Sequence, residues 1–346
     1  MRIAVDGKAL VGPAGGVARY VEGLLAGIES LAPERFSIEL LRPGKNGSTL
    51  LWTLWNLQRA SGEGFHVLHC PFYYTPLAPR CPVTVAIHDV LPLEHPEWFA
   101  RSTLSPIRHL MPITARRANA VVTDAECIAQ AIEELCHVPR QNIRVIPHAV
   151  DHEQFHLQPM AVSTEARRRW AGGHPYLLQG GALEPRRGID LSLVAMMELR
   201  RRRPELVLVL VGGGRAPVPE LDAPPPWVVR PGFVPDEELP ALYAGAEAVL
   251  SPSRGEGFDL PLLEALACGA AVVASDIPVH VEHFGPAVEL FASGDAEDLA
   301  GAVETVLSDS ERARELREAA PRLAARFTWE RSAAAHLELW REIAGR

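Results

Sequence analysis

Short apolar runs recur along the chain, separated by longer stretches of mixed apolar and polar residues. The runs are dense in Val, Ile and Leu and do not alternate with polar residues. Such runs are typical of parallel strands in a sheet that helices cover on both faces. The pattern predicts strands within residues 1–6, 36–41, 66–70, 83–89, 120–124, 143–151, 176–181, 206–214, 227–233, 246–253 and 270–276.

The runs fall into two groups, because residues 150–175 are polar and lack strand character, with a short helix expected at 165–170. A chain of 346 residues also exceeds the size at which one core usually keeps growing. Strands that alternate with helices twice over predict an α/β protein of two Rossmann-like, doubly wound parallel-sheet domains facing across a cleft. We expect an N-terminal domain at residues 1–160 and a C-terminal domain at 161–325.

Residues 326–346 have the pattern of a final surface helix. Thr328 is a good N-cap residue, and Glu330 lies in the first turn, where a negative charge suits the helix dipole. Leu337 and Trp340 belong to an apolar stripe, which a helix must pack on another surface. We expect this helix to pack back on the N-terminal domain.

Composition narrows the class of protein. The formal net charge of -9 argues against a nucleic-acid-binding protein. The five cysteines are an odd number without paired metal-binding spacing, which predicts free thiols in a reducing compartment. The N-terminus lacks the apolar core of a signal peptide, and no apolar run reaches the roughly 18 residues of a membrane-spanning helix. We therefore expect a cytoplasmic protein.

Residues 101–120 carry four arginines among apolar residues. A basic amphipathic helix of this kind can face a membrane or an acceptor molecule. An ordinary surface helix is the favoured alternative, because Pro106 and Pro112 are expected to interrupt the segment.

The stretch EGFDLPLLE, residues 256–264, places two glutamates eight positions apart. Pro261 suits the first turn of a helix, which puts Glu264 on that helix and Glu256 in the loop before it. Gly257 allows close approach of a ligand, and the N–H groups of a helix start bind anionic oxygens. Ionised carboxylates accept hydrogen bonds from hydroxyl groups. The pattern fits a nucleotide sugar; two solvated surface glutamates are the alternative.

The longer string PSRGEGFDLPLLEALACGAAVVASD resembles the E-x7-E region of the retaining glycosyltransferases of family 4, which have the GT-B fold. The stretches GALEPRRGIDLSL, GFVPDEELPALYAGAEAVLSPS and IPHAVDHEQF are similar to further segments of that family. HDVLPLEHPEWF and FTWERSA are similar to bacterial mannosyltransferases that build surface polysaccharides.

The resemblance implies a role for each matching position. Glu256 would bind hydroxyl groups of the transferred sugar, Glu264 would hold the ribose, and Arg187, where the family usually has lysine, would neutralise the diphosphate. His88 ends a strand and would lie near the donor sugar, with a satisfied core histidine as the alternative. We assign His88, Arg187 and Glu256 to catalysis. Donor-binding residues are expected at Gly15, Gly16, Arg186, Gly212, Val234, Gly257, Phe258, Asp259, Leu260 and Glu264.

Two further features of the sequence have alternative roles. Gly15 and Gly16 do not form a dinucleotide-binding fingerprint, but a glycine-rich loop here approaches the donor phosphates in the resembling family. His69 and His148 also end predicted strands, and a core role suits them as well as a role in binding.

Three positions depart from the family pattern. Asp259 replaces a small residue; it can cap the helix, but its carboxylate would repel a diphosphate. Ala182 stands where many members have an arginine, and Ala271 replaces a common proline.

The chain has no D-x-D motif, so we expect a metal-independent transferase without a cofactor. The expected partners are a nucleotide-sugar donor, with GDP-mannose favoured, and a glycan or lipid-linked acceptor. The rivals are a non-catalytic nucleotide-sugar-binding protein and a GT-B epimerase or phosphorylase. A phosphorylase needs a cofactor lysine, and the chain has only Lys8 and Lys45.

Overall fold

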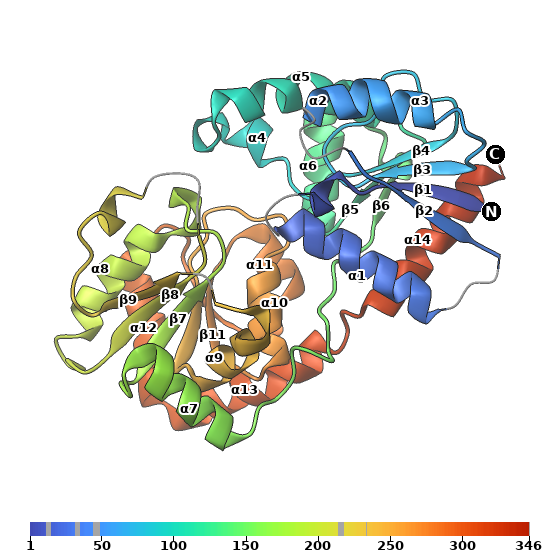
Figure 1. The fold of residues 1–346 in the computed structure, drawn as a ribbon. Coiled ribbons are helices and arrows are strands. Elements are labelled where there is room, and N and C mark those ends of the chain that lie inside the picture. Colours follow the sequence, from blue (N-terminus) through green and yellow to red (C-terminus); the bar gives the residue numbers. More distant parts are fainter. Residues whose placement is uncertain (12–14, 32–34, 44–48, 214–217, 233, 346) are drawn as a thin grey trace. The chain divides into compact units, whose positions relative to one another are not determined.

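A computed structural model describes residues 1–11, 15–31, 35–43, 49–213, 218–232 and 234–345. The chain divides into two compact units (Figure 1). Unit 1 comprises Met1–Ala149 and Phe327–Arg346, and unit 2 comprises Val150–Arg326. The division lies at 149/150 rather than at 160/161, because residues before 160 already contact unit 2: Phe155 packs on Tyr243, and Gln154 donates to Asp236 O at 2.7 Å.

Unit 1 is built on a six-stranded parallel sheet with the order β2-β1-β3-β4-β5-β6. All six strands fall within ranges predicted from the sequence. Their bounds are β1 (Arg2–Asp6), β2 (Ser37–Leu41), β3 (Val67–Cys70), β4 (Val83–Ala86), β5 (Ala120–Thr123) and β6 (Ile143–Val145).

Helices flank the unit 1 sheet (Figure 1). A short π-helix (Trp52–Leu57) joins α2 to α3. The α-helices are α1 (Gly16–Ser30), α2 (Thr49–Leu51), α3 (Gln58–Ala60), α4 (Leu91–Glu94), α5 (Arg101–Arg117), α6 (Glu126–Cys136) and α14 (Trp329–Ala344).

Helix α14 returns to unit 1 after unit 2 is complete, and it packs along α1. Thr328 caps it as expected, accepting a hydrogen bond from the Arg331 N–H at 3.3 Å. Gly23 and Gly27 of α1 allow the close approach, because a side chain at either position would collide with Trp329. The predicted apolar stripe is buried: Leu337 and Trp340 join the core of unit 1.

Helix α5 differs from the expectation for residues 101–120. Pro106 and Pro112 were expected to interrupt the segment, but one helix runs through both. Buried residues along one face, including Leu104, Ile107 and Met111, anchor the helix on unit 1. Tertiary packing of this kind supplies most of the stability of a helix, which explains how it survives two missing N–H donors.

Unit 2 contains a second six-stranded parallel sheet, with the order β12-β11-β10-β7-β8-β9. Five strands lie where the sequence predicts them, whereas β12 was not predicted. The strands are β7 (Tyr176–Gly180), β8 (Val207–Val211), β9 (Val228–Gly232), β10 (Ala248–Ser251), β11 (Val272–Ser275) and β12 (Glu289–Phe291).

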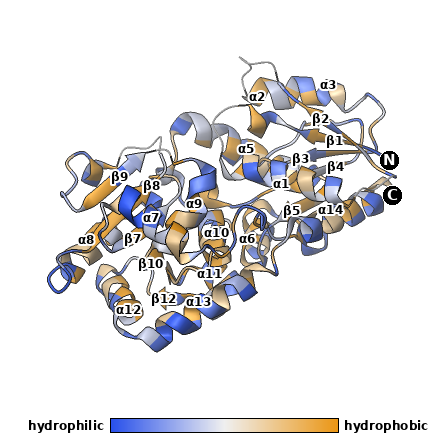
Figure 2. Cartoon of the chain, turned by 60° about the horizontal axis from the view of Figure 1, so that its bottom comes forward, coloured by the Kyte–Doolittle hydropathy of each residue, from blue (hydrophilic) through white to orange (hydrophobic). Residues whose placement is uncertain are grey.

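The helices of unit 2 cover its sheet, with hydrophobic residues concentrated in the strands and hydrophilic residues on the outer helix surfaces (Figure 2). The expected short helix at 165–170 is part of α7. The helices are α7 (Met160–Ala171), α8 (Ile189–Leu199), α9 (Leu239–Gly245), α10 (Leu260–Ala267), α11 (Pro278–His283), α12 (Ala296–Ser308) and α13 (Ser310–Ala324).

Each strand order reverses at one place, and this is where open α/β sheets bind ligands. In unit 2 the chain leaves β7 toward β8 and leaves the neighbouring β10 toward β11. In unit 1 the corresponding neighbours are β1 and β3. Within the part of the chain that the structure describes, no helix is long and apolar enough to cross a bilayer.

Candidate functional site

The switch point of unit 2 brings the predicted acidic and basic residues together. The loop after β7 carries Arg186 and Arg187 in a 3-10 turn, Pro185–Arg187, and the loop after β10 carries Glu256 just before α10. The two loops meet directly, since the Arg254 N–H donates to Arg186 O at 2.8 Å. Parallel strand order therefore places all three side chains at one edge of the sheet.

The Glu256 carboxylate is buried between the two arginines. Its Oε2 lies 3.0 Å from Arg186 Nη1, and its Oε1 lies 2.9 Å from Arg187 Nη1. The Ser253 hydroxyl also donates to Oε1, at 2.7 Å. Glu256 is thus not a solvated loop residue. Because each carboxylate oxygen has about two acceptor sites, Oε2 can accept one further hydrogen bond.

Asp259 lies on the other side of Arg187. Its Oδ1 is 2.9 Å from Arg187 Nη1, and its Oδ2 accepts hydrogen bonds from the Ser251 hydroxyl and from His280 Nε2. Burial raises the pKa of Asp259, but the charge of Arg187 and the bonds from His280 and Ser251 outweigh burial and hold it well below its usual range. The side chain does not cap α10, contrary to one expectation, because these partners occupy it.

Arg187 is buried among these carboxylates. Burial lowers its pKa, but the charges of Glu256 and Asp259 outweigh burial and raise it, so the guanidinium stays charged. Its Nε makes no hydrogen bond to any described residue although it is buried. The turn therefore presents a fixed positive charge with an unused donor.

Glu264 lies on α10, as predicted, but inside the unit rather than on its surface. The Tyr243 hydroxyl of α9 donates to Glu264 Oε2 at 3.1 Å. This hydrogen bond holds the Glu264 carboxylate in place before any ligand arrives. Burial and the nearby Glu264 charge together raise the pKa of the Cys268 thiol to about 12.

The remaining predicted donor residues of unit 2 act through backbone or packing. The Phe258 side chain is buried against Phe284, with ring centroids 5.5 Å apart, so only its backbone can serve a ligand. Gly257 is partly exposed, and Val234 and Leu260 are buried. Gly212 has a φ of +125° and a side chain there would collide with the Gly181 carbonyl, so close packing of two strand ends requires this glycine.

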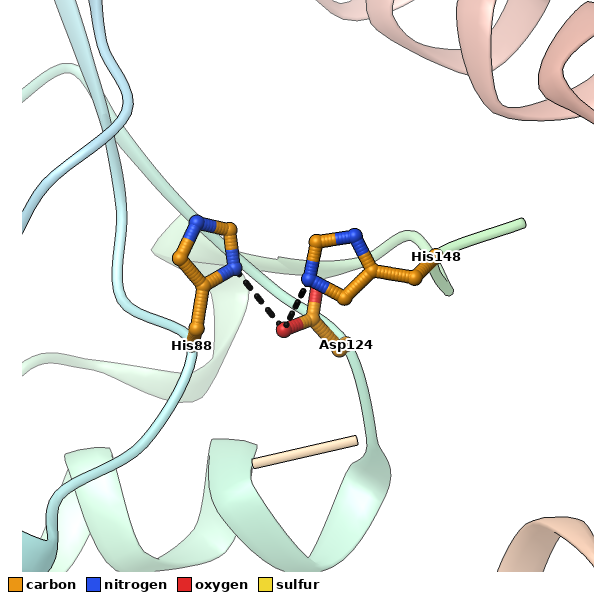
Figure 3. A group of neighbouring side chains, drawn as sticks. All are labelled: His88, Asp124 and His148. Carbon is orange, nitrogen blue, oxygen red and sulfur yellow. Dashed lines mark hydrogen bonds and ion pairs between the residues drawn. The ribbon is translucent and has the colours of Figure 1, made fainter. Parts of the chain in front are cut away.

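In unit 1, three predicted strand ends converge on one carboxylate, Asp124 (Figure 3). His88 Nδ1 lies 2.9 Å and His148 Nε2 lies 3.1 Å from Asp124 Oδ2, and the two rings stack 4.8 Å apart. Burial raises the pKa of Asp124, but the two histidines outweigh burial and lower it well below its usual range.

His88 has oxygen atoms at both ring nitrogens, because its Nε2 lies 3.2 Å from Pro71 O. Burial lowers the pKa of His88, but Asp124 outweighs burial and raises it. The three ligand atoms of His88, Asp124 and His148 lie within 4.8 Å of one another, and two imidazoles with one carboxylate are a set that can hold a divalent metal ion.

The other candidates in unit 1 divide between core and surface. His69 is a satisfied core histidine: it bonds the Tyr20 hydroxyl at 2.9 Å and Thr84 at 2.8 Å. Gly15 and Gly16 begin α1 on the surface, and a side chain at either position would meet open space. Packing among the described residues does not require these two glycines, which leaves room for a ligand.

Sequence reasoning missed the residues that hold the site together. Ser251, Ser253 and His280 bond the two predicted carboxylates, and Asp124 joins His88 to His148. Ser253 and Asp124 end predicted strands and Ser251 lies within one, which is the one signal that marks them. His280 lies on α11, where neither spacing nor a motif indicates its partner.

Two family models match the chain. The model described as "Glycosyltransferase Family 4" matches residues 28–154, and the one described as "Glycosyl transferases group 1" matches residues 163–323. Together the matches cover most of the chain, and they divide close to the boundary between the two units.

Curated relatives and a solved structure agree with these matches. The chain is 29% identical over 255 residues to O-antigen chain mannosyltransferase B of Escherichia coli, covering 70% of this chain and 66% of the relative. It is 34% identical over 211 residues to a GDP-mannose-dependent alpha-(1-6)-phosphatidylinositol dimannoside mannosyltransferase of Mycobacterium tuberculosis, covering 60% of this chain and 54% of the relative. The matched region is thus less than two thirds of each relative's own length.

The structure of HepE from Anabaena in complex with UDP-glucose superposes with a TM-score of 0.77 at 18% identity, covering 99% of this chain and 100% of that one. Identity at this level shows a shared fold alone. Together with the family matches, it confirms the predicted fold class and the resemblance carried by the E-x7-E block. The chain therefore belongs to the glycosyltransferases, with a family 4 domain followed by a group 1 domain, and has the GT-B fold.

Proposed function

We propose that this protein transfers a hexose, with mannose favoured, from a nucleoside-diphosphate sugar to a glycan or lipid-linked acceptor. The observation that carries the proposal is the buried cluster at the unit 2 switch point. Glu256 stands between Arg186 and Arg187 at 3.0 and 2.9 Å, and Glu264 is held one turn into the following helix. Family membership supplies the reaction class.

Each group has a task in this reaction. Arg187, with Arg186 beside it, neutralises the charge that develops on the leaving diphosphate, and Glu256 Oε2 accepts a hydrogen bond from a sugar hydroxyl. Glu264 holds the ribose hydroxyls. Two fixed guanidinium groups supply the charge stabilisation that other transferases obtain from a divalent ion, so we propose that the reaction needs no metal.

We further propose that the anomeric configuration is retained. The bond between the anomeric carbon and the diphosphate oxygen breaks, and the bond to the acceptor oxygen forms on the same face of the sugar. The acceptor hydroxyl proton passes to an oxygen of the leaving diphosphate, so atoms and charge balance without a protein nucleophile. His88 would contact the donor sugar, and it must then give up one of its bonds to Asp124 or Pro71.

GDP-mannose is the proposed donor, because both curated relatives are named as mannosyltransferases and one as GDP-mannose-dependent. We also propose a cytoplasmic location with peripheral contact at the inner face of the membrane. Helix α5 supports this contact: Arg101, Arg108, Arg116 and Arg117 are exposed on it, and it contains no acidic residue. A lipid-linked acceptor would be met at such a surface.

A melting-temperature screen against GDP, UDP, ADP, dTDP and their common sugars tests the donor. A ligand at 100 times its dissociation constant stabilises the folded state by about 2.7 kcal/mol, a shift of roughly 5–10 °C for a domain of this size. We expect GDP-mannose to give the largest shift and Glu264→Gln to abolish it. Tyr243→Phe, which removes the bond to Glu264 but keeps the carboxylate, is the matched control and should retain most of the shift.

Turnover separates an active transferase from the rival, a non-catalytic binding protein. An active enzyme hydrolyses its donor slowly without an acceptor, and Glu256→Gln should abolish this hydrolysis. Donor binding with no turnover, unchanged by Glu256→Gln, would establish the rival. Absence of a shift with every nucleotide would refute both.

A further inference from the structure

Asp259 poses a problem of charge for the proposed function. A carboxylate beside a diphosphate site should repel the ligand, and Asp259 Oδ1 lies 2.9 Å from the arginine assigned to that ligand. Its backbone is also strained, with a φ of +77° in the left-handed region that a non-glycine residue rarely adopts. A strained, buried acid at this place calls for a specific role.

The contacts of Arg187 show what the acid does to the guanidinium. Both carboxylates, Glu256 and Asp259, bind the same nitrogen, Nη1, each at 2.9 Å. The opposite edge of the group consists of Nε and Nη2, and Nε is buried without a hydrogen-bond partner among the described residues. Since a buried unpaired donor is unfavourable, that edge is left ready for an oxygen of a ligand.

His280 holds the second carboxylate oxygen of Asp259. Its Nδ1 lies 2.9 Å from Ser275 O, and its Nε2 lies 3.2 Å from Asp259 Oδ2. The Ser275 hydroxyl donates to Ser253 O at 2.6 Å, so it cannot also donate to the ring. Both ring nitrogens therefore face oxygens, and Nε2 can donate a hydrogen bond to Asp259 Oδ2. Asp259 is thus held by Arg187 at one oxygen and by the His280 ring at the other.

We propose that Asp259 is a positioning residue: it fixes Arg187 by Nη1 so that the Nε–Nη2 edge is preset for a phosphate oxygen of a nucleoside diphosphate, while His280 and Ser251 hold its other oxygen. The proposal rests on the proposed function, because it takes the diphosphate as the ligand of Arg187. A positioning role means that Asp259 strengthens nucleotide binding, whereas simple repulsion means that it weakens this binding. A pre-fixed guanidinium binds two oxygens without first having to be ordered.

Asp259→Asn separates the two views by the sign of its effect. Loss of a negative charge removes repulsion, so simple electrostatics predicts tighter binding of GDP. Loss of the anchor frees Arg187, so positioning predicts weaker binding. Asparagine tolerates the left-handed region as aspartate does, and Asp259→Gly relieves the strain outright, so at least one variant is expected to fold.

The experiment measures GDP and UDP binding to the full chain by titration calorimetry, with the melting temperature of each variant as a folding check. We expect both Asp259 variants to weaken binding of the preferred nucleotide at least tenfold. In the Arg187→Gln background, Asp259→Asn should change the affinity less than twofold, because the anchored group is gone. Asp190→Asn is the matched control: it removes one charge and a carboxylate that binds Arg254 at 2.6 Å, and should leave affinity unchanged.

Unchanged or tighter binding in Asp259→Asn and Asp259→Gly would overturn the positioning role. Equal losses from Asp259→Asn with and without Arg187 would also overturn it, since the acid would then act independently. If Arg187→Gln alone leaves affinity intact, or if the unaltered protein binds neither nucleotide, the proposed function of the site fails as well. A tenfold loss in Arg187→Gln with tighter binding in Asp259→Asn would keep the function and refute only this inference.

Discussion

Trp340→Ala is the sharpest test of how the chain is divided into units. Trp340 lies on α14, which follows unit 2 in sequence but packs in the core of unit 1. Its side chain is fully buried, and its indole N–H donates to Thr84 Oγ1 at 3.3 Å. Removing a buried tryptophan side chain destabilises a core by about 3–5 kcal/mol. The lost hydrogen bond adds little, because Thr84 keeps its bond to His69.

Amide hydrogen exchange resolves the effect by unit. A loss of about 3–5 kcal/mol should speed exchange in the core strands of unit 1 by roughly 100- to 4,000-fold, while the strands of unit 2 keep their protection. Leu316→Ala in α13 is the matched control: that leucine is buried in the unit 2 core, and its loss should reverse the pattern. Trp340→Phe, which keeps a ring in the cavity, should show a smaller effect.

Equal acceleration of exchange in β8 and β10 and in β1 and β3 by Trp340→Ala would contradict this prediction. It would mean that the two units unfold together or that α14 supports unit 2. Protection unchanged throughout would show that the indole contributes nothing to the unit 1 core.

Three further predictions concern charge. Burial raises the pKa of Asp6 to about 6 despite bonds from Trp52 and Lys8, so the folded state holds this proton more tightly than the unfolded chain. Burial of Asp6 therefore destabilises the fold above that pH and ceases to do so near pH 4. The Asn side chain in Asp6→Asn can keep both hydrogen bonds at its Oδ1. In urea titrations, the free energy of unfolding of Asp6→Asn should exceed that of the unaltered protein by as much as ~3 kcal/mol at pH 7.5, and this gain should disappear near pH 4. A pH-independent difference would refute the assignment. Chelation of metal ions by EDTA should leave sugar transfer unchanged. If EDTA abolishes transfer, and zinc restores transfer in the unaltered protein but not in His148→Gln, the reaction depends on a metal and the His88–Asp124–His148 group holds the ion. Arg108→Glu with Arg117→Glu should abolish cosedimentation with vesicles rich in anionic lipid, while the same reversal at Arg314 on α13 should not; equal binding by all variants would exclude α5 as the contact.

Much of the fold could be predicted because its signals are local. Of the twelve strands in the described part of the chain, eleven lie within the Val/Ile/Leu-rich runs predicted from the sequence, and the Thr328 cap is a property of one residue. Strand β12 was missed because it has only two apolar residues, whereas the equally short β6 lies within the longer predicted run 143–151. Helix α5 shows the opposite error: two prolines argued for interruption, but packing of its buried face outweighed them.

Site residues that belong to a sequence motif could be predicted, whereas contacts that depend on how distant segments pack could not. Glu256, Glu264 and Arg187 could be placed because strand order brings loops after β7 and β10 together. The burial of the Glu256 and Glu264 side chains could not be predicted from the sequence, because the exposure of these side chains depends on the neighbouring loops. Asp259 was read as a helix cap or a source of repulsion. Its partner His280 is 21 residues away, and no spacing rule links the two.

The return of the chain to unit 1 has a consequence during synthesis on the ribosome. Residues 1–149 lack the helix that completes their core until residues 329–344 have been made. At about 5–20 residues per second, that delay lasts roughly 10–40 s, during which the face of α1 beneath α14 has no cover. Unit 2 is continuous in sequence and can finish first. The nascent protein therefore completes its second domain before its first, and the apolar face of α1 is the segment most in need of a chaperone.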